Sequence, residues 1–216
     1  MSQMTAADLV QHLSDTGFPS AFVAENADAL RKALPPNRQV LITSLPKTGS
    51  TLLFRALAVA IGRPINLVTY STDGNEQELY FPALLHAVLH KPGLCRLHMR
   101  ATRPNLALIH ALHLTPIVLV RDLFDIIVSQ RDHITRKLYG TMGQVTAEHA
   151  DPLHERFRTL SDEEQFDQLI DLNLPWLLEF YRSWHDAAAA GQVPVMWLNY
   201  SEIHADKAGA LTKCAT

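Results

Sequence analysis

Short apolar runs alternate along this chain with longer stretches in which hydrophobic residues recur at helical spacing. The clearest runs are Gln39–Thr43, Pro116–Val120 and Pro194–Leu198, each too short for a helix. Runs of this kind predict strands buried inside a sheet. Two weaker runs predict further strands at Ile65–Val68 and Gly93–Met99.

Helical periodicity fills most of the chain between these runs. Apolar residues at helical spacing predict helices at Ala21–Leu34, Glu78–His90, Asn105–Leu114 and Phe166–Ala190. They also predict a short first helix capped by Thr5, a helix from Ser50 through Ile61, and a helix that contains Ile126, Ile127 and His133. The polar stretch Leu138–Pro152 contains Gly140 and Gly143 and predicts a mobile loop. Strands that alternate with helices indicate an α/β fold, a mostly parallel sheet flanked by helices. In such sheets ligands bind at the carboxyl ends of the strands.

Composition and charge narrow the class of protein. The chain has 216 residues, of which 47% are hydrophobic, which suits one domain over residues 1–216 with its core at about 39–203. A net charge of −3 gives no general attraction to nucleic acid or to anionic membranes. Two cysteines make no disulfide framework, and no apolar leader or membrane-length segment is present. We therefore expect a soluble cytoplasmic protein without nucleic-acid or membrane partners; no feature of the sequence indicates an oligomeric state.

A turn with anion-binding chemistry follows the first predicted strand. It runs from Leu45 to Leu52 and reads LPKTGSTL. Gly49 lets the backbone approach an anion, and the amides after it lie at a helix N-terminus. Ser50 and Thr51 add hydroxyl donors, and Lys47 adds a charge that can reach a terminal oxyanion. The turn is not a Walker A loop, because its Lys precedes its only Gly; ordinary helix capping by Gly, Ser and Thr is the alternative reading.

A second candidate anion site follows the strand Pro116–Val120. Arg121 ends this strand, and Ser129 lies eight residues later on the next helix. The guanidinium of Arg offers a fork of donors suited to phosphate, and Ser129 can add a hydroxyl. A local salt bridge from Arg121 to Asp122 or Asp125 is the alternative. Anion sites at two strand ends would suit a ligand that carries phosphates at both ends.

Together these segments resemble the PAPS-dependent sulfotransferase family. Pro46–Thr51 matches the family's Pro-Lys-[Ser/Thr]-Gly-[Ser/Thr]-Thr loop for the 5′-phosphosulfate, and Arg121 with Ser129 matches its 3′-phosphate motif. Arg96-Leu97-His98 stands where cytosolic members have Lys-x-His, and Leu198–Glu202 looks like their strand-terminal Tyr-Glu segment. The likeness covers about residues 39–203.

The resemblance implies a P-loop NTPase-like fold and a function. A member of this family transfers a sulfuryl group from PAPS (3′-phosphoadenosine 5′-phosphosulfate) in line to a hydroxyl or amine, here of a small-molecule or carbohydrate acceptor, without a metal. The product is adenosine 3′,5′-bisphosphate. His98 would be the general base and Lys47 would offset charge on the leaving phosphate. The donor would be held by Lys47, Thr48, Gly49, Ser50, Thr51, Arg121, Ser129 and Tyr200.

The chain departs from the family's pattern at three places. Leu52 replaces the Trp that stacks on adenine in cytosolic members, and Arg96 replaces a Lys. Relatives also continue past the Tyr-Glu segment into a basic Gly-rich loop that covers the 3′-phosphate, whereas this chain ends at Thr216. We therefore expect a missing C-terminal cap, and a catalytically inactive nucleotide-binding remnant is an alternative function.

Other polar residues suggest weaker hypotheses. A P-loop kinase would need an acidic residue for Mg²⁺ at a strand end, and Asp122 is the candidate for it. The segments Tyr70–Tyr80 and His133–His149 are placed to line an acceptor pocket. Three acidic residues in or near the first segment, Asp73, Glu76 and Glu78, hint at a polar or cationic acceptor. His86 and His90 lie four apart on a helix without a third ligand, so we expect a solvent-facing pair rather than a metal site.

Overall fold

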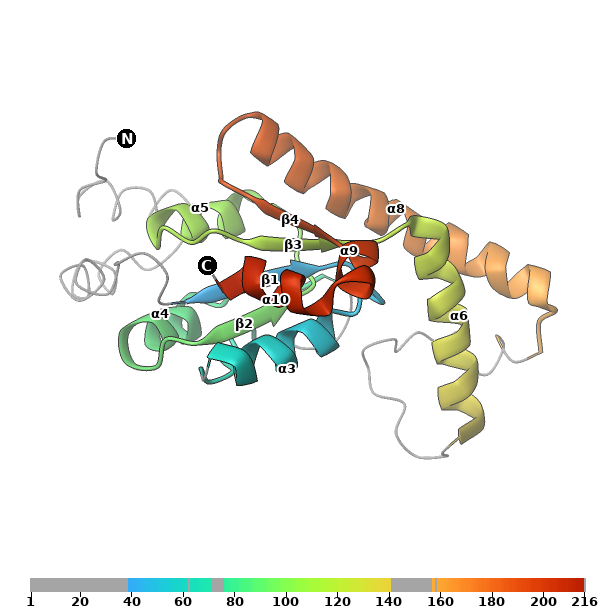
Figure 1. Ribbon diagram of the computed structural model, residues 1–216. Coiled ribbons are helices and arrows are strands. Elements are labelled where there is room, and N and C mark those ends of the chain that lie inside the picture. The colour runs from blue at the N-terminus through green and yellow to red at the C-terminus, as the bar shows by residue number, and fades with distance from the viewer. Residues whose placement is uncertain (1–38, 62, 71–75, 141–156, 158, 216) are drawn as a thin grey trace.

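The protein's described residues build a parallel sheet covered by helices on both faces (Figure 1). The structure, a computed structural model, describes residues 39–61, 63–70, 76–140, 157 and 159–215. Its strands are β1 (Val40–Ser44), β2 (Leu94–Leu97), β3 (Ile117–Val120) and β4 (Met196–Asn199), in the order β2-β1-β3-β4. Every pairing is parallel, so the predicted α/β fold is confirmed. The predicted helices before Gln39 lie outside the described residues.

Neighbouring residues of the central strand point to opposite faces of the sheet, because side chains alternate along a strand. Leu41 belongs to a core shared with α4 (Phe81–His90), α5 (Arg103–Ala111), α6 (Leu123–Gly140) and α8 (Asp162–Ala189). Ile42 belongs to a core shared with α3 (Ser50–Ile61), α9 (Tyr200–Ala205) and α10 (Lys207–Ala215). In Figure 1, α6 extends away from the sheet, beside the first half of α8.

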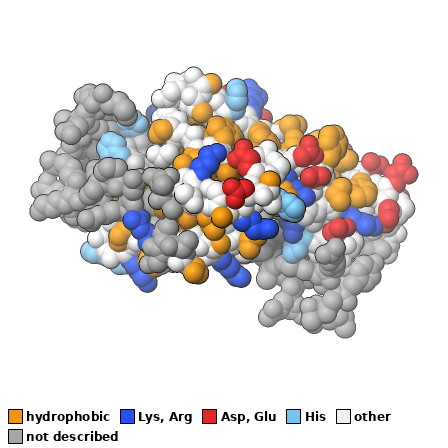
Figure 2. Space-filling view, in the orientation of Figure 1, with side chains coloured by type: hydrophobic (Ala, Val, Ile, Leu, Met, Phe, Trp, Pro, Cys, Tyr) orange, Lys and Arg blue, Asp and Glu red, His pale blue; other side chains and the backbone are white. Residues whose placement is uncertain are grey.

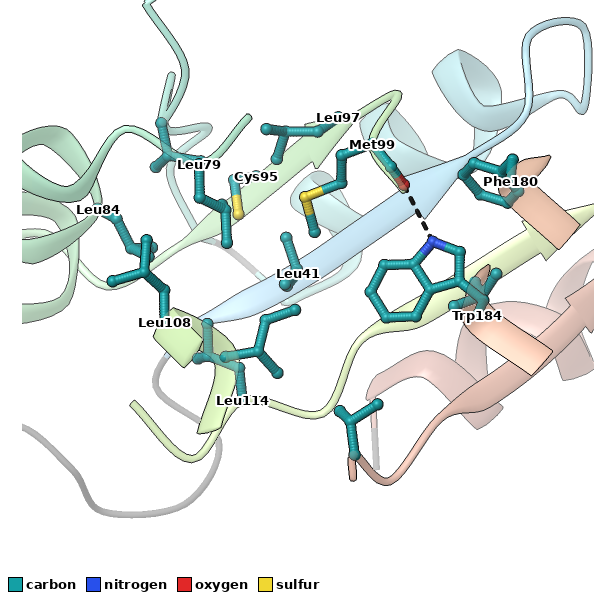
Figure 3. Packing of buried hydrophobic residues seen from close by; sticks show 14 of the residues in the cluster. Leu41, Leu79, Leu84, Cys95, Leu97, Met99, Leu108, Leu114, Phe180 and Trp184 are labelled. Atoms are coloured by element: carbon teal, nitrogen blue, oxygen red, sulfur yellow. Dashed lines mark hydrogen bonds between the residues drawn. The ribbon is translucent and has the colours of Figure 1, made fainter. Parts of the chain in front are cut away.

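Trp184 is the largest side chain in the core on the α8 face. Its side chain and that of Phe180, four residues earlier on α8, have 0% exposure. Figure 3 shows the indole against the strands, with its Nε1–H donating to the Met99 carbonyl at 3.0 Å. The indole N–H is the one polar group of a Trp side chain, and this bond replaces the hydrogen bond to water that it loses on burial.

Helix boundaries differ from the prediction at several places: α5 spans Arg103–Ala111 rather than Asn105–Leu114, and α8 begins at Asp162 rather than at Phe166. At the start of α4, tertiary contacts compete with helix formation. The helix expected from Glu78 begins at Phe81, since the Leu79 amide donates to Asn105 Oδ1 and the Tyr80 amide to the Val68 carbonyl. Helix α6 continues to Gly140, so residues 138–140 are helical rather than part of the predicted loop. The rest of that loop lies outside the described residues.

The strand predicted at Ile65–Val68 is wrong. Only Ile65 forms a bridge, to Leu94. Beyond it, residues 76–80 approach the end of β2: the Gln77 amide donates to the His98 carbonyl and the Tyr80 amide to the Val68 carbonyl. These bonds replace the ladder that a fifth strand would need.

Acidic side chains gather at the start of α8 (Figure 2). Ser161 caps this helix in a capping box with Glu164, and Asp162 and Glu163 complete its acidic first turn. Negative charge at this position stabilises the helix, because it interacts favourably with the positive N-terminal end of the helix dipole. Of the helices that the structure describes, none combines the length and apolar character needed to cross a membrane.

Candidate functional site

The candidate site residues meet at the carboxyl edge of the sheet. The loop of residues 45–52, which carries the predicted anion-binding motif, follows β1; His98 follows β2, Arg121 follows β3 and Tyr200 follows β4. All four strand ends open on a cavity of about 710 Å³. Its lining comprises Pro46, Lys47, Gly49, Ser50, Thr51, Leu52, Phe54, Ile65, Asn66, Leu67, Thr69, Gln77, Arg96, His98, Arg121, Ser129, His133 and Tyr200. The fold therefore brings together every predicted site residue except Thr48, which is fully buried behind the lining.

The phosphate loop (residues 45–52) has a backbone shape that suits an anion. Lys47 and Gly49 take positive φ angles of 61° and 73°, which turn the chain sharply before α3 begins at Ser50. Thr48 lies between them, and its hydroxyl donates to the Leu45 carbonyl at 2.8 Å. Because that hydroxyl is occupied and buried, Thr48 can offer a ligand only its backbone amide. The loop thus places backbone N–H groups at a helix N-terminus, the usual setting for a bound anion.

Arg96 on β2 orders the hydroxyl groups that follow Gly49. Its Nη1 donates to Ser50 Oγ at 3.1 Å and to Thr51 Oγ1 at 2.9 Å. Its guanidinium also lies 5.9 Å from the centre of the Phe54 ring. Since both hydroxyl oxygens accept from Arg96, their O–H groups are left to point elsewhere as donors. Both hydrogen bonds come from the same nitrogen of Arg96.

The hydrogen bonds of His98 fix which ring nitrogen is basic. Its Nδ1 lies 2.7 Å from the Ser44 carbonyl oxygen and 3.3 Å from Ser44 Oγ. A carbonyl only accepts hydrogen bonds, so Nδ1 carries the proton and Nε2 carries the lone pair. The backbone of His98 is held by Gln77, whose Oε1 accepts its amide at 2.8 Å. This arrangement suits a general base.

Arg121 lies between the phosphate loop and α9. Its Nη1 donates to the Lys47 carbonyl at 2.8 Å, and its guanidinium stacks 4.2 Å from the centre of the Tyr200 ring. Asp125 Oδ2 is 3.6 Å from Nε, too far for a hydrogen bond. Buried Nε accordingly finds no hydrogen-bond partner among the described residues. The salt-bridge alternative explains only part of the position of Arg121.

The first half of α6 supplies the remaining polar wall. Ser129 and His133 are one helical turn apart and both line the cavity, so they share a face of the helix. Ser129 lines the same cavity as Arg121, as the sequence predicted. His133 also lines the cavity, as expected for the start of the segment His133–His149; residues 141–149 lie outside the described residues.

The lining is rich in positive charge and, among the described residues, contains no carboxylate. Lys47, Arg96 and Arg121 are cations, and neither Asp nor Glu contributes to the lining. Asp122 faces its own helix instead, where its Oδ1 accepts the amides of Phe124 and Asp125 at 2.9 and 3.1 Å. Such a field favours an anionic ligand.

The acidic residues that hinted at a cationic acceptor have other partners. Glu76 accepts from Arg100 Nε at 2.7 Å and from Trp176. Glu78 accepts from the Thr102 hydroxyl, and burial is the main cause that raises the pKa of its carboxyl. Neither lines the cavity; Asp73 lies outside the described residues. His86 and His90 are exposed, as predicted.

Sequence reasoning missed several lining residues. Asn66 and the exposed side chains of Ile65 and Leu67 reach the cavity from a segment without a motif. The segment Tyr70–Tyr80 is predicted to line the pocket, and its residue Gln77 does so; residues 71–75 lie outside the described residues. No sequence pattern indicates what Gln77 would contact. Its contact with His98 depends on a turn that the hydrophobic pattern does not reveal.

Comparisons with known proteins give likenesses among solved structures alone. No protein-family model matches the chain, and no curated protein matches it. Among solved structures, the chain is similar to the mouse sulfotransferase SULT7A1 complexed with PAP, with 16% sequence identity and a TM-score of 0.49 over 86% of this chain. The chain spans 61% of the length of that protein. A likeness this distant assigns no role to any residue here.

Proposed function

We propose that this protein is a sulfotransferase that moves a sulfuryl group from PAPS to a hydroxyl or amine. The observation that carries the proposal is the convergence of the family's motif residues on one cavity. Four segments that are far apart in the chain supply its polar wall, in positions that follow β1, β2, β3 and β4. Separate capping and salt-bridge roles would not require this convergence.

The cavity has the donors that a doubly phosphorylated nucleotide needs. The phosphate loop with Ser50, Thr51 and Lys47 would hold the 5′-phosphosulfate. Arg121, which lines the cavity, would hold the 3′-phosphate with its guanidinium. Ser129 would add a hydroxyl from α6, and the Tyr200 ring would hold the Arg121 guanidinium in place by stacking on it. Charge-assisted bonds of this kind are about twice as strong as neutral ones.

The reaction then needs a base and a counter-charge. His98 Nε2 would accept the proton of the acceptor hydroxyl or amine while the acceptor atom bonds to sulfur. As the bond from sulfur to the bridging oxygen breaks, negative charge grows on the 5′-phosphate, and the Lys47 ammonium would offset it. Base assistance of this type is typically worth about 10²–10⁴ in rate.

Calorimetric titration of the whole chain with adenosine 3′,5′-bisphosphate tests the donor site. We expect micromolar binding, no binding of ATP with Mg²⁺, and at least about tenfold weaker binding in Lys47→Ala, since a hydrogen bond to a charged group is typically worth about 1.5–3 kcal/mol. Lys207→Ala, which removes an exposed Lys away from the cavity, is the matched control. Preference for Mg-ATP would support the kinase alternative and refute the proposal.

Turnover separates an enzyme from an inactive remnant. Release of adenosine 3′,5′-bisphosphate from PAPS would be measured against a panel of phenols, alcohols, amines and sugars. Acceptor-dependent release that is lost in His98→Gln, while nucleotide affinity is kept, is the expected result. Tight nucleotide binding without turnover for any acceptor would identify a nucleotide-binding protein instead.

A further inference from the structure

Arg121 and Tyr200 hold the phosphate loop from outside it. The Lys47 carbonyl, which receives Arg121 Nη1 at 2.8 Å, belongs to a residue with φ of 61°. Left-handed backbone is unfavourable for a residue with a side chain, and it persists only where the surroundings enforce it. The bond from Arg121 is a contact of this enforcing kind.

Tyr200 completes the support on the other side of the loop. A Cβ atom placed on Gly49 would lie 3.1 and 3.2 Å from two carbons of the Tyr200 ring, so the ring is packed directly against the loop backbone. The same ring lies under the Arg121 guanidinium at 4.2 Å. The backbone of Arg121 is fixed as well, because its carbonyl accepts a hydrogen bond from the Tyr181 hydroxyl at 3.0 Å.

We infer that Lys47, Gly49, Arg121 and Tyr200 form a brace that couples the two anion sites. In this brace, Arg121 is a positioning residue for the phosphate loop as well as a ligand for the second phosphate. A 5′-phosphate would therefore bind more weakly when Arg121 is removed, even if the ligand has no 3′-phosphate. The part that concerns ligands rests on the proposed function; the brace itself does not.

Amide hydrogen exchange tests the brace without a ligand. In Arg121→Ala and in Tyr200→Leu, the amides of residues 48–53 should exchange at least about tenfold faster than in the wild type, because loss of a charge-assisted bond is worth about that factor. Tyr200→Phe should behave as the wild type, since the ring and not the hydroxyl makes the contacts. Tyr80→Leu, a change at a half-exposed tyrosine outside the cavity, is the matched control. Unchanged exchange in residues 48–53 of both Arg121→Ala and Tyr200→Leu would overturn the brace.

Two nucleotides then test the coupling. AMP carries only the 5′-phosphate, and Arg121→Ala should weaken AMP binding at least about tenfold. If Arg121 served the 3′-phosphate alone, Arg121→Ala would bind AMP as the wild type does and only bisphosphate binding would fall; that result would overturn the coupling. A wild-type chain that bound neither nucleotide would refute the proposed function, and the exchange measurement would still decide the brace.

Discussion

Replacing Gly49 with Ala should lower both the stability of the fold and the affinity of the site for nucleotide. Gly191 provides a control for the loss of stability. Gly49 and Gly191 have nearly equal φ angles, +73° and +67°. A Cβ at Gly191 meets nothing within 4 Å, whereas one at Gly49 lies 3.1 Å from the Tyr200 ring. The two substitutions therefore share the backbone strain and differ in the contact.

The strain alone is worth about 1–2 kcal/mol, the cost of left-handed backbone for a residue with a Cβ. In a chain of this size that lowers Tm by about 2–8 °C, which is the expectation for Gly191→Ala. Gly49→Ala adds overpacking against a ring held by Arg121, typically about 1–3 kcal/mol more.

Thermal unfolding by circular dichroism would measure both variants, and calorimetry would measure their affinity for adenosine 3′,5′-bisphosphate. Gly191→Ala should keep the affinity of the wild type, and Gly49→Ala should lose at least about tenfold. Equal Tm values for the two variants, together with unchanged affinity in Gly49→Ala, would refute the close packing of Tyr200 on the loop.

Three further outcomes follow from the core and the base. His98→Gln should lower kcat by about 10²–10⁴ with little change in nucleotide affinity, as measured by steady-state kinetics and calorimetry. Trp184→Phe should cost only about 1 kcal/mol in urea unfolding, because the Met99 carbonyl keeps its bond from Thr43 Oγ1 at 3.0 Å; Trp184→Ala should cost about 3–5 kcal/mol. Burial raises the pKa of the Cys95 thiol to about 12. The unfolded chain therefore releases this proton first as pH rises, so stability should fall between about pH 9 and 12 at up to about 1.4 kcal/mol per pH unit. Cys95→Ala should show a smaller slope over that range.

Most of the sheet could be predicted because its strands carry their own signal. Residues 40–44, 117–120 and 196–199 form strands within two residues of the predicted bounds, since parallel strands that helices cover on both faces are largely apolar. The segment Ile65–Val68 has a similar pattern yet forms only one bridge. Its pairing is decided by residues 76–80, which compete for the same backbone groups.

The site could be predicted at the strand ends and not elsewhere. Lys47 and Arg121 each follow a predicted strand and His98 lies near the end of another, and parallel strands bring their carboxyl ends together. The stacking of Arg121 on Tyr200 and the two hydrogen bonds from Arg96 Nη1 to Ser50 and Thr51 depend on side-chain directions, which a spacing pattern does not contain.

The strand order β2-β1-β3-β4 also determines when the protein can finish folding during its synthesis. β1 emerges first, but β4 follows only after the long helix α8. At about 5–20 residues per second, a ribosome needs about 8–30 s to go from the end of β1 to the end of β4. Until then β3, whose four residues are all buried in the finished protein, has an unpaired apolar edge. Slower translation would prolong this interval. We expect nascent chains to aggregate more when chaperones that cover this edge are depleted.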